Sequence, residues 1–244
     1  MLTFDNGRFQ YAVEDFSIID HLSFEVQDGE FVSIIGASGC GKSTIFRLVN
    51  KLLTPASGVI RVDGESIETK KNYCGYMPQQ DLLFPWRTVR ENLMLPMEIQ
   101  GGYSKEQMQK KADDALRSVG LADWGDKTPK ELSGGMRQRA AFARTVLTGS
   151  DLLLLDEPFS ALDYLTRLSM REWLLEQWEK EKKTVVFITH DVEEAVFLSS
   201  RILVVEQSPI THLRSIEVPA GYPRSREELR RPEILSLKEE LIGM

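Results

Sequence analysis

The chain has few cysteines and no long apolar run. Of its 244 residues only two are cysteine, Cys40 and Cys74, and they form no disulfide framework and no metal-ligand cluster. No apolar run approaches the ~18 residues that a membrane-spanning helix needs. The stretch Met1–Asp5 also lacks the basic and apolar regions of a signal peptide. We therefore expect a reducing cytoplasm as the setting, and any membrane role to depend on a partner protein.

An excess of basic residues is also missing. The net charge is −7 and the isoelectric point is about 5.2, which gives no electrostatic argument for binding nucleic acid or an anionic membrane. The basic residues between Arg224 and Arg231 alternate with Glu227 and Glu228, a pattern that indicates a solvated helix face. The hydrophobic content of 42% is enough for one large α/β domain or for a core with a subdomain.

The most informative stretch that is present fits the phosphate-binding P-loop pattern of Gly, four residues, Gly-Lys, and Ser or Thr. The apolar run 31–35 predicts a buried strand that enters the loop, and 43–53 carries apolar residues at helical spacing after it. The residues predicted to surround the nucleotide phosphates are Gly36, Ala37, Ser38, Gly39, Cys40, Gly41, Lys42, Ser43 and Thr44.

Each residue type in this loop has a chemical reason to be there. Glycines permit positive φ and let backbone N–H groups converge on phosphate oxygens, and the N-terminus of the next helix adds unpaired donors. The Lys42 ammonium is suited to the β- and γ-phosphates as a catalytic group, and the Ser43 hydroxyl is suited to Mg²⁺. The sequence therefore predicts a site for ATP and Mg²⁺.

Apolar periodicity around the P-loop predicts an α/β fold. Continuous apolar strands that alternate with helices indicate a parallel sheet with helices on both faces, the core of a P-loop NTPase. Short strands with turns precede the P-loop strand and indicate an N-terminal antiparallel β layer. From about Thr88 to Leu147 strand signals are absent and helical periodicity replaces them, with a capping box at Ser104–Gln107. This stretch indicates an inserted helical subdomain.

This pattern divides the chain into an ATPase domain and a tail. We expect the domain over 1–206, with the β layer and P-loop core in 1–87 and 148–206 and the helical subdomain in 88–147. The tail, 207–244, is expected to hold a short strand near 216–218 and a helix from about Ser225.

Two carboxylates, Asp156 and Glu157, follow the apolar run Leu152–Leu155. Taken alone, they fit a strand end with a capping Asp equally well. Beside a P-loop, an Asp at the tip of a neighbouring parallel strand holds Mg²⁺ through water, and the next Glu polarises the attacking water. We predict Asp156 as a metal residue and Glu157 as the catalytic base.

The stretch Leu132–Arg139 reads Leu-Ser-Gly-Gly-Met-Arg-Gln-Arg. By itself it fits a loop with an ordinary helix cap, although Ser133, Gly134 and Gly135 would present a hydroxyl and open N–H groups as a second anion site. It resembles the signature motif of the ABC transporter ATPases, and the resemblance covers roughly residues 2–206. In that family the signature of one subunit closes over ATP held by the other, which implies a head-to-tail dimer.

The resemblance implies roles for further residues. Gln79, rather than Gln80, corresponds to the Q-loop glutamine that reaches Mg²⁺ and the attacking water. Asp163 corresponds to the D-loop, which crosses the dimer interface. His190 corresponds to the switch histidine that contacts the γ-phosphate, although a histidine after a strand is more often structural.

Finer features resemble the importer subfamily for nitrate, alkanesulfonates, taurine and related small solutes, in which some relatives are linked to pyrimidine precursors of thiamin. They are the stretch Phe84–Thr88, the signature extension Met136–Arg139 and the stretch Thr189–Ala195. The family also has an aromatic residue before the P-loop that stacks on adenine. Tyr11 is our choice for it, with Phe9 as the alternative.

The predicted function is therefore that of the ATP-binding and ATP-hydrolysing subunit of a bacterial ABC importer. The implied partners are a second ATPase subunit, transmembrane permease subunits and an extracytoplasmic solute-binding protein, with no nucleic acid. The implied location is peripheral, on the cytoplasmic face of the cell membrane. One alternative is a soluble ABC ATPase that acts on nucleic acid or ribosomes, but such proteins usually have two ATPase halves or a long coiled-coil insert, and this sequence has neither. The other is a small-molecule kinase, which would not need the signature motif.

Overall fold

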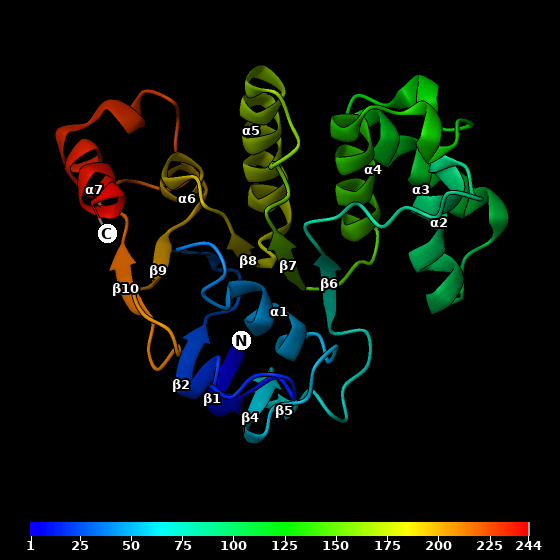
Figure 1. Cartoon of the computed structure of the whole chain (residues 1–244). Coiled ribbons are helices and arrows are strands. Elements are labelled where there is room, and N and C mark those ends of the chain that lie inside the picture. Colours follow the sequence, from blue (N-terminus) through cyan, green and yellow to red (C-terminus); the bar gives the residue numbers. More distant parts are fainter. Residues whose placement is uncertain (244) are drawn as a thin grey trace. The chain divides into compact units, whose positions relative to one another are not determined.

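The computed structural model describes residues 1–243, which form two compact units (Figure 1). The first unit contains Met1–Tyr73 and Trp173–Met244, and the second contains Cys74–Glu172. The helical segment expected at 88–147 thus shares its unit with the strands on either side of it. No helix within 1–243 is long and apolar enough to cross a bilayer.

The first unit contains an antiparallel sheet and a largely parallel one. The antiparallel sheet has the order β2-β1-β4-β5, and the parallel strands have the order β9-β3-β8, with β10 antiparallel on β9. The strands are β1 (Leu2–Phe9), β2 (Ile19–Val26), β3 (Phe31–Gly36), β4 (Ser57–Val62), β5 (Glu65–Ser66), β8 (Thr184–Ile188), β9 (Arg201–Val205) and β10 (Arg214–Glu217).

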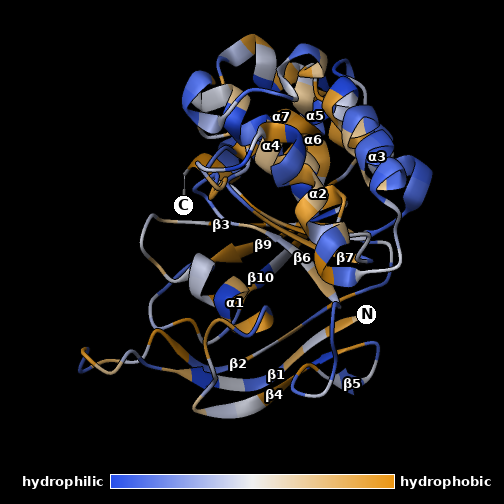
Figure 2. Cartoon of the chain, turned by 90° about the vertical axis from the view of Figure 1, so that its right-hand side faces the viewer, coloured by the Kyte–Doolittle hydropathy of each residue, from blue (hydrophilic) through white to orange (hydrophobic). Residues whose placement is uncertain are grey.

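The burial of these strands explains their sequence patterns. Every residue of β8 is buried, as is all of β3 except Gly36, because a parallel sheet is covered on both faces and so needs continuous apolar strands. Figure 2 accordingly shows β9 in the colour of hydrophobic residues. The first of the short strands expected before the P-loop is β1, whose pairing with β2 shifts between Phe4 and Gly7.

The helices of the first unit are α1 (Lys42–Val49), α6 (Val192–Leu198) and α7 (Pro232–Ile242), with the end of α5 (Tyr164–Glu181). Helix α1 ends before the predicted Leu53 because Asn50 caps it and Lys51 has φ 62°, outside the helical region. Helix α7 begins at Pro232, later than the expected Ser225, since proline is favoured in the first turn of a helix.

The second unit combines a parallel strand pair with a group of helices. Strand β6 (Cys74–Met77) pairs with β7 (Leu152–Asp156). The helices are α2 (Val89–Gln100), α3 (Lys105–Ser118), α4 (Gly134–Val146) and the start of α5. Helix α3 is mostly hydrophilic in Figure 2, and only Ala112 and Leu116 of it are buried.

Local sequence signals determine where these helices begin. The predicted capping box at Ser104 is confirmed: Gln107 N donates to Ser104 Oγ over 3.2 Å, and Ser104 N donates to Gln107 Oε1 over 2.8 Å. Thr88 and Glu91 form an equivalent box at the start of α2. Each box satisfies donors that the first helical turn otherwise leaves unpaired.

Candidate functional site

The P-loop connects β3 to α1, as the sequence predicts. Gly36, Gly39 and Gly41 have φ of 154°, 79° and 108°, values that residues with a Cβ rarely adopt. A Cβ at Gly41 would lie 2.6 Å from Ile18 Cγ2. The conformation of the loop therefore depends on glycine both for its backbone angles and for space.

Lys42 folds back over this loop. Its Nζ donates to the carbonyl oxygens of Gly36 and Ala37, each over 2.8 Å, and the residue is buried. The hydrogen bonds hold the ammonium among the peptide groups of the loop. This places the cation where the sequence predicts nucleotide phosphates.

The predicted adenine-stacking residue lies beside the P-loop helix. The Tyr11 hydroxyl is 3.2 Å from Thr44 Oγ1, and Arg47 donates to it over 3.5 Å. Phe9 is buried and makes an edge-to-face contact with Tyr11 at a centroid distance of 4.8 Å. Tyr11 is partly accessible whereas Phe9 belongs to the core, so the surroundings of the two residues favour Tyr11.

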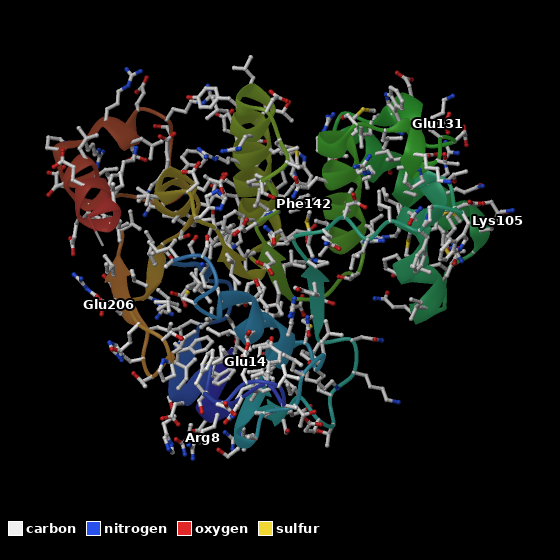
Figure 3. All side chains as sticks on the ribbon, viewed as in Figure 1. Arg8, Glu14, Lys105, Glu131, Phe142 and Glu206 are labelled. Atoms are coloured by element: carbon white, nitrogen blue, oxygen red, sulfur yellow. The ribbon has the colours of Figure 1, made fainter. Side chains whose placement is uncertain are left out.

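His190 follows β8 and is exposed. It lines a cavity of about 360 Å³ together with Gly36 and Ala37 of the P-loop. Strands β3, β8 and β9 are parallel, so their carboxyl ends meet at one edge, where ligands of such sheets bind. Glu206, labelled in Figure 3, follows β9 and lines the same cavity.

The second unit holds the predicted acidic pair. Asp156 is buried at the end of β7, and Glu157, with φ 48°, is partly accessible. Gln79 Nε2 donates to Glu157 Oε2 over 3.0 Å. The sequence predicted a role for each of these side chains, and the structure joins Gln79 and Glu157 by a hydrogen bond.

Ser133 is the N-cap of α4, and its Oγ accepts a hydrogen bond from Met136 N over 3.2 Å. Ser133 and Gly134 are exposed, and Gly135 is partly exposed. The predicted signature therefore presents its hydroxyl and glycines at the accessible end of a helix, the kind of end that favours anions.

Gln138 is a site residue that sequence reasoning missed. It is 3% exposed and donates through Nε2 to Glu157 O over 3.1 Å and to Ser160 Oγ over 3.3 Å. Its Oε1 accepts from Ala161 N over 2.8 Å. One side chain of α4 thus fixes the backbone that carries Glu157, and only its place within the signature extension could have drawn attention to it.

Asp163 caps the start of α5. Its Oδ1 accepts a hydrogen bond from Thr166 N over 3.0 Å, and hydrogen bonds from the Thr166 side chain and backbone lower the pKa of Asp163. The side chain is exposed. The cap accounts for an ionised carboxylate at this position, and a role at a dimer interface stays a prediction.

The predicted residues fall into two groups. Those in the first unit are Tyr11, Gly36 to Thr44 and His190, and those in the second unit are Gln79, Ser133 to Gly135, Asp156, Glu157 and Asp163. Among the residues that the structure describes, no three His, Cys, Asp or Glu side chains form a metal-binding group. A Mg²⁺ ion bound with ATP does not need one, because it takes few protein ligands beside phosphate oxygens and water.

Comparison with known proteins identifies the family. The family model described as ABC transporter matches residues 19–160. The chain belongs to the ABC transporter family. It is 44% identical over 233 residues to the formylaminopyrimidine import ATP-binding protein ThiZ of Halalkalibacterium halodurans, with 96% of this chain and 90% of that protein covered.

Two further relatives of this ABC protein are informative. It is 40% identical over 209 residues to the aliphatic sulfonates import ATP-binding protein SsuB of Bacillus cereus, with 86% of this chain and 82% of that protein covered. The dimeric, post-hydrolysis structure of the ATP-binding cassette MJ0796 with ADP and Pi matches with a TM-score of 0.81 and 28% identity, covering 91% of this chain and 100% of that chain.

These findings confirm the predicted fold class and the predicted function. The chain is an ATP-binding and ATP-hydrolysing subunit of an ABC import system. The MJ0796 cassette is a dimer in its solved structures. The roles of the individual site residues stay predictions.

Proposed function

We propose that this chain hydrolyses Mg-ATP in a head-to-tail homodimer. Each ATP would lie between the P-loop of one copy and Ser133, Gly134 and Gly135 of the other. The cavity that His190 shares with Gly36 and Ala37 supports the nucleotide site, and the dimeric MJ0796 cassette with ADP and Pi supports the pairing of two copies. A switch histidine must reach the γ-phosphate from such a place. Asp163 of each copy would lie near the interface.

Within this site we assign a task to each residue. Tyr11 stacks on adenine, the backbone from Gly36 to Thr44 binds the phosphates, and the Lys42 ammonium neutralises charge on the β- and γ-phosphates. Glu157 accepts the proton of the attacking water, and Gln79 holds the Glu157 carboxylate in place through the hydrogen bond already described. His190 donates a hydrogen bond to the γ-phosphate.

The oxygen donors fit Mg²⁺. Ser43, Gln79 and Asp156 offer a hydroxyl, an amide and a buried carboxylate, the hard ligands that this ion prefers. When bound, Mg²⁺ supplies positive charge against the phosphate oxygens. We assign these three residues to hold it with ATP.

The surface that meets the permease is proposed to be the segment Leu82–Trp86. Trp86 is 75% exposed and stacks on Phe84 at a centroid distance of 5.0 Å. Asn92 fixes the segment from inside: its Oδ1 accepts from Phe84 N over 2.7 Å, and its Nδ2 donates to Phe84 O over 3.1 Å. An apolar cluster on a fixed backbone suits a short helix of a membrane subunit.

The transported solute is proposed to be a small pyrimidine delivered by an extracytoplasmic solute-binding protein. The relative named for formylaminopyrimidine import matches 96% of this chain, whereas the sulfonate relative matches 86%. The complex would place this subunit on the cytoplasmic face of the membrane. We propose no nucleic-acid partner, since the net charge is −7.

Reconstitution tests this proposal. The chain would be placed in vesicles with its permease subunits, and ATP hydrolysis measured with the solute-binding protein loaded with a formylaminopyrimidine, with an alkanesulfonate, or empty. We expect stimulation by the pyrimidine-loaded protein only. Stimulation by the sulfonate would overturn the solute assignment, and hydrolysis insensitive to every form would overturn the role in import.

A further inference from the structure

The C-terminal segment after β9 is bound to the core through Arg224. The alternating charges of 224–231 indicate a solvated face, but Arg224 is 4% exposed, so for this residue the interpretation is wrong. Its guanidinium donates to the carbonyl oxygens of Ser199, Val218 and Ala220. Burial of its two terminal nitrogens is tolerated because backbone acceptors replace water there.

Two of the contacts made by this segment lie at the carboxyl end of α6. Arg224 donates to Ser199 O, and the Tyr222 hydroxyl donates to Leu198 O over 2.6 Å. The last carbonyl groups of a helix lack partners within the helix, and a cation there is favourable. The Tyr222 ring makes an edge-to-face contact with the Trp178 ring, at a centroid distance of 4.6 Å.

Helix α7 covers the side of α6. Ala195 and Val196 belong to one buried cluster with Ile234, Leu237 and Leu241 of α7, and the two helices lie side by side in Figure 1. An ion pair of 3.7 Å between Lys238 and Glu193 adds a polar contact. The segment therefore holds α6 at its end and along its side.

The amino end of α6 is joined to His190. Thr189 Oγ1 donates to Glu194 Oε2 over 2.6 Å and accepts from Asp191 N over 3.0 Å. Asp191 Oδ1 accepts from Glu193 N over 2.8 Å. These bonds bracket His190 on both sides, so a shift of α6 moves the histidine.

We propose that Arg224 and Tyr222 are positioning residues for His190. They fix α6, and through it they hold the histidine beside Gly36 and Ala37 at the cavity that Leu241 of α7 also lines. The inference rests on the proposed role of His190 in ATP hydrolysis. It gives Arg224 and Tyr222 a part in that reaction, although neither residue lines the cavity.

The test compares Arg224→Met with Arg231→Met, a control whose side chain is exposed and pairs with Glu228 in the same segment. We expect Arg224→Met to lower kcat about tenfold, because a displacement of ~1 Å far from the chemistry can cost up to ~100-fold. KM for ATP should stay nearly constant, since Tyr11 and Lys42 are untouched. Arg231→Met should leave both kcat and KM unchanged.

A double-mutant cycle with His190→Ala separates positioning from general destabilisation. If Arg224 acts through His190, Arg224→Met should have almost no further effect on kcat once the histidine is gone. Equal losses with and without His190 would overturn the proposal. Should Arg224→Met fail to fold, Tyr222→Phe, which removes one hydroxyl, takes its place in the same cycle.

The two proposals can fail separately. If His190→Ala alone leaves kcat unchanged, the role of His190 is wrong and the inference is overturned with it. If His190→Ala lowers kcat but Arg224→Met and Tyr222→Phe do not, only the inference is overturned.

Discussion

Gln79 Nε2 donates a hydrogen bond of 3.0 Å to Glu157 Oε2. On its other side, the Glu157 carbonyl accepts from Gln138 over 3.1 Å. The side chain and the backbone of the proposed base are therefore held by two different glutamines. Since Glu157 also has φ 48°, a value that costs free energy outside glycine, these bonds stabilise a conformation that the residue would not adopt alone.

Glu157→Gln should bind ATP and hydrolyse it very slowly. The amide keeps the shape of the side chain but cannot accept the proton, and loss of a positioned base costs about 10²- to 10⁴-fold in rate. The trapped protein should accumulate as a dimer with two ATP molecules. Size-exclusion chromatography with and without Mg-ATP checks this, and a folded, ATP-bound protein that stays monomeric would contradict the closed dimer of the isolated subunit.

Lys42→Ala should abolish hydrolysis and weaken ATP binding while the fold survives. The change removes the only side-chain ammonium among the nine residues of the predicted P-loop, and with it the charge that the β- and γ-phosphates require. ATP titration and phosphate release measure the two effects. Lys105→Ala, on the exposed start of α3, serves as the matched control, and near-normal hydrolysis by Lys42→Ala would refute the role.

Gln138→Leu should lower both stability and kcat. The leucine fills similar space but removes the hydrogen bonds to the Glu157 carbonyl and the Ala161 N–H, and each such bond contributes about 0.5–1.5 kcal/mol to stability. Urea unfolding measures the first effect and steady-state kinetics the second. Gln109→Leu, on an exposed face of α3, is the control. Unchanged kcat per folded molecule would show that Gln138 only stabilises the fold.

Trp86→Ala should impair assembly with the permease while basal ATP hydrolysis is retained. The side chain is 75% exposed, so its removal costs the isolated subunit little stability, whereas an interface loses an aromatic anchor. Copurification with the permease subunits is the measurement. Ile99→Ala, also an exposed apolar residue of the second unit, should assemble normally, and equal assembly of both variants would rule out the docking role.

Features that depend on neighbouring residues could be predicted from the sequence. The strand, loop and helix around Lys42 follow each other directly, and the capping box joins Ser104 to Gln107, three positions later, so local patterns contain all the information. Gln138 could not be found in this way, because its partner Glu157 is 19 residues away. The burial of Arg224 could not be predicted for a similar reason. Charge alternation indicates a solvated helix face, but burial of the Arg224 guanidinium depends on the Ser199 carbonyl, 25 residues earlier.

The bonds of Gln138 also have a consequence for the two ATP molecules of the proposed dimer. Helix α4 starts at Ser133, which would contact the partner's nucleotide, and carries Gln138, which fixes the backbone of Glu157 for the chain's own nucleotide. Occupancy of one site would then alter the base at the other, so that hydrolysis is cooperative. The Hill coefficient for ATP should exceed one, with a ceiling of about two for two sites, and Gln138→Leu should bring it toward one.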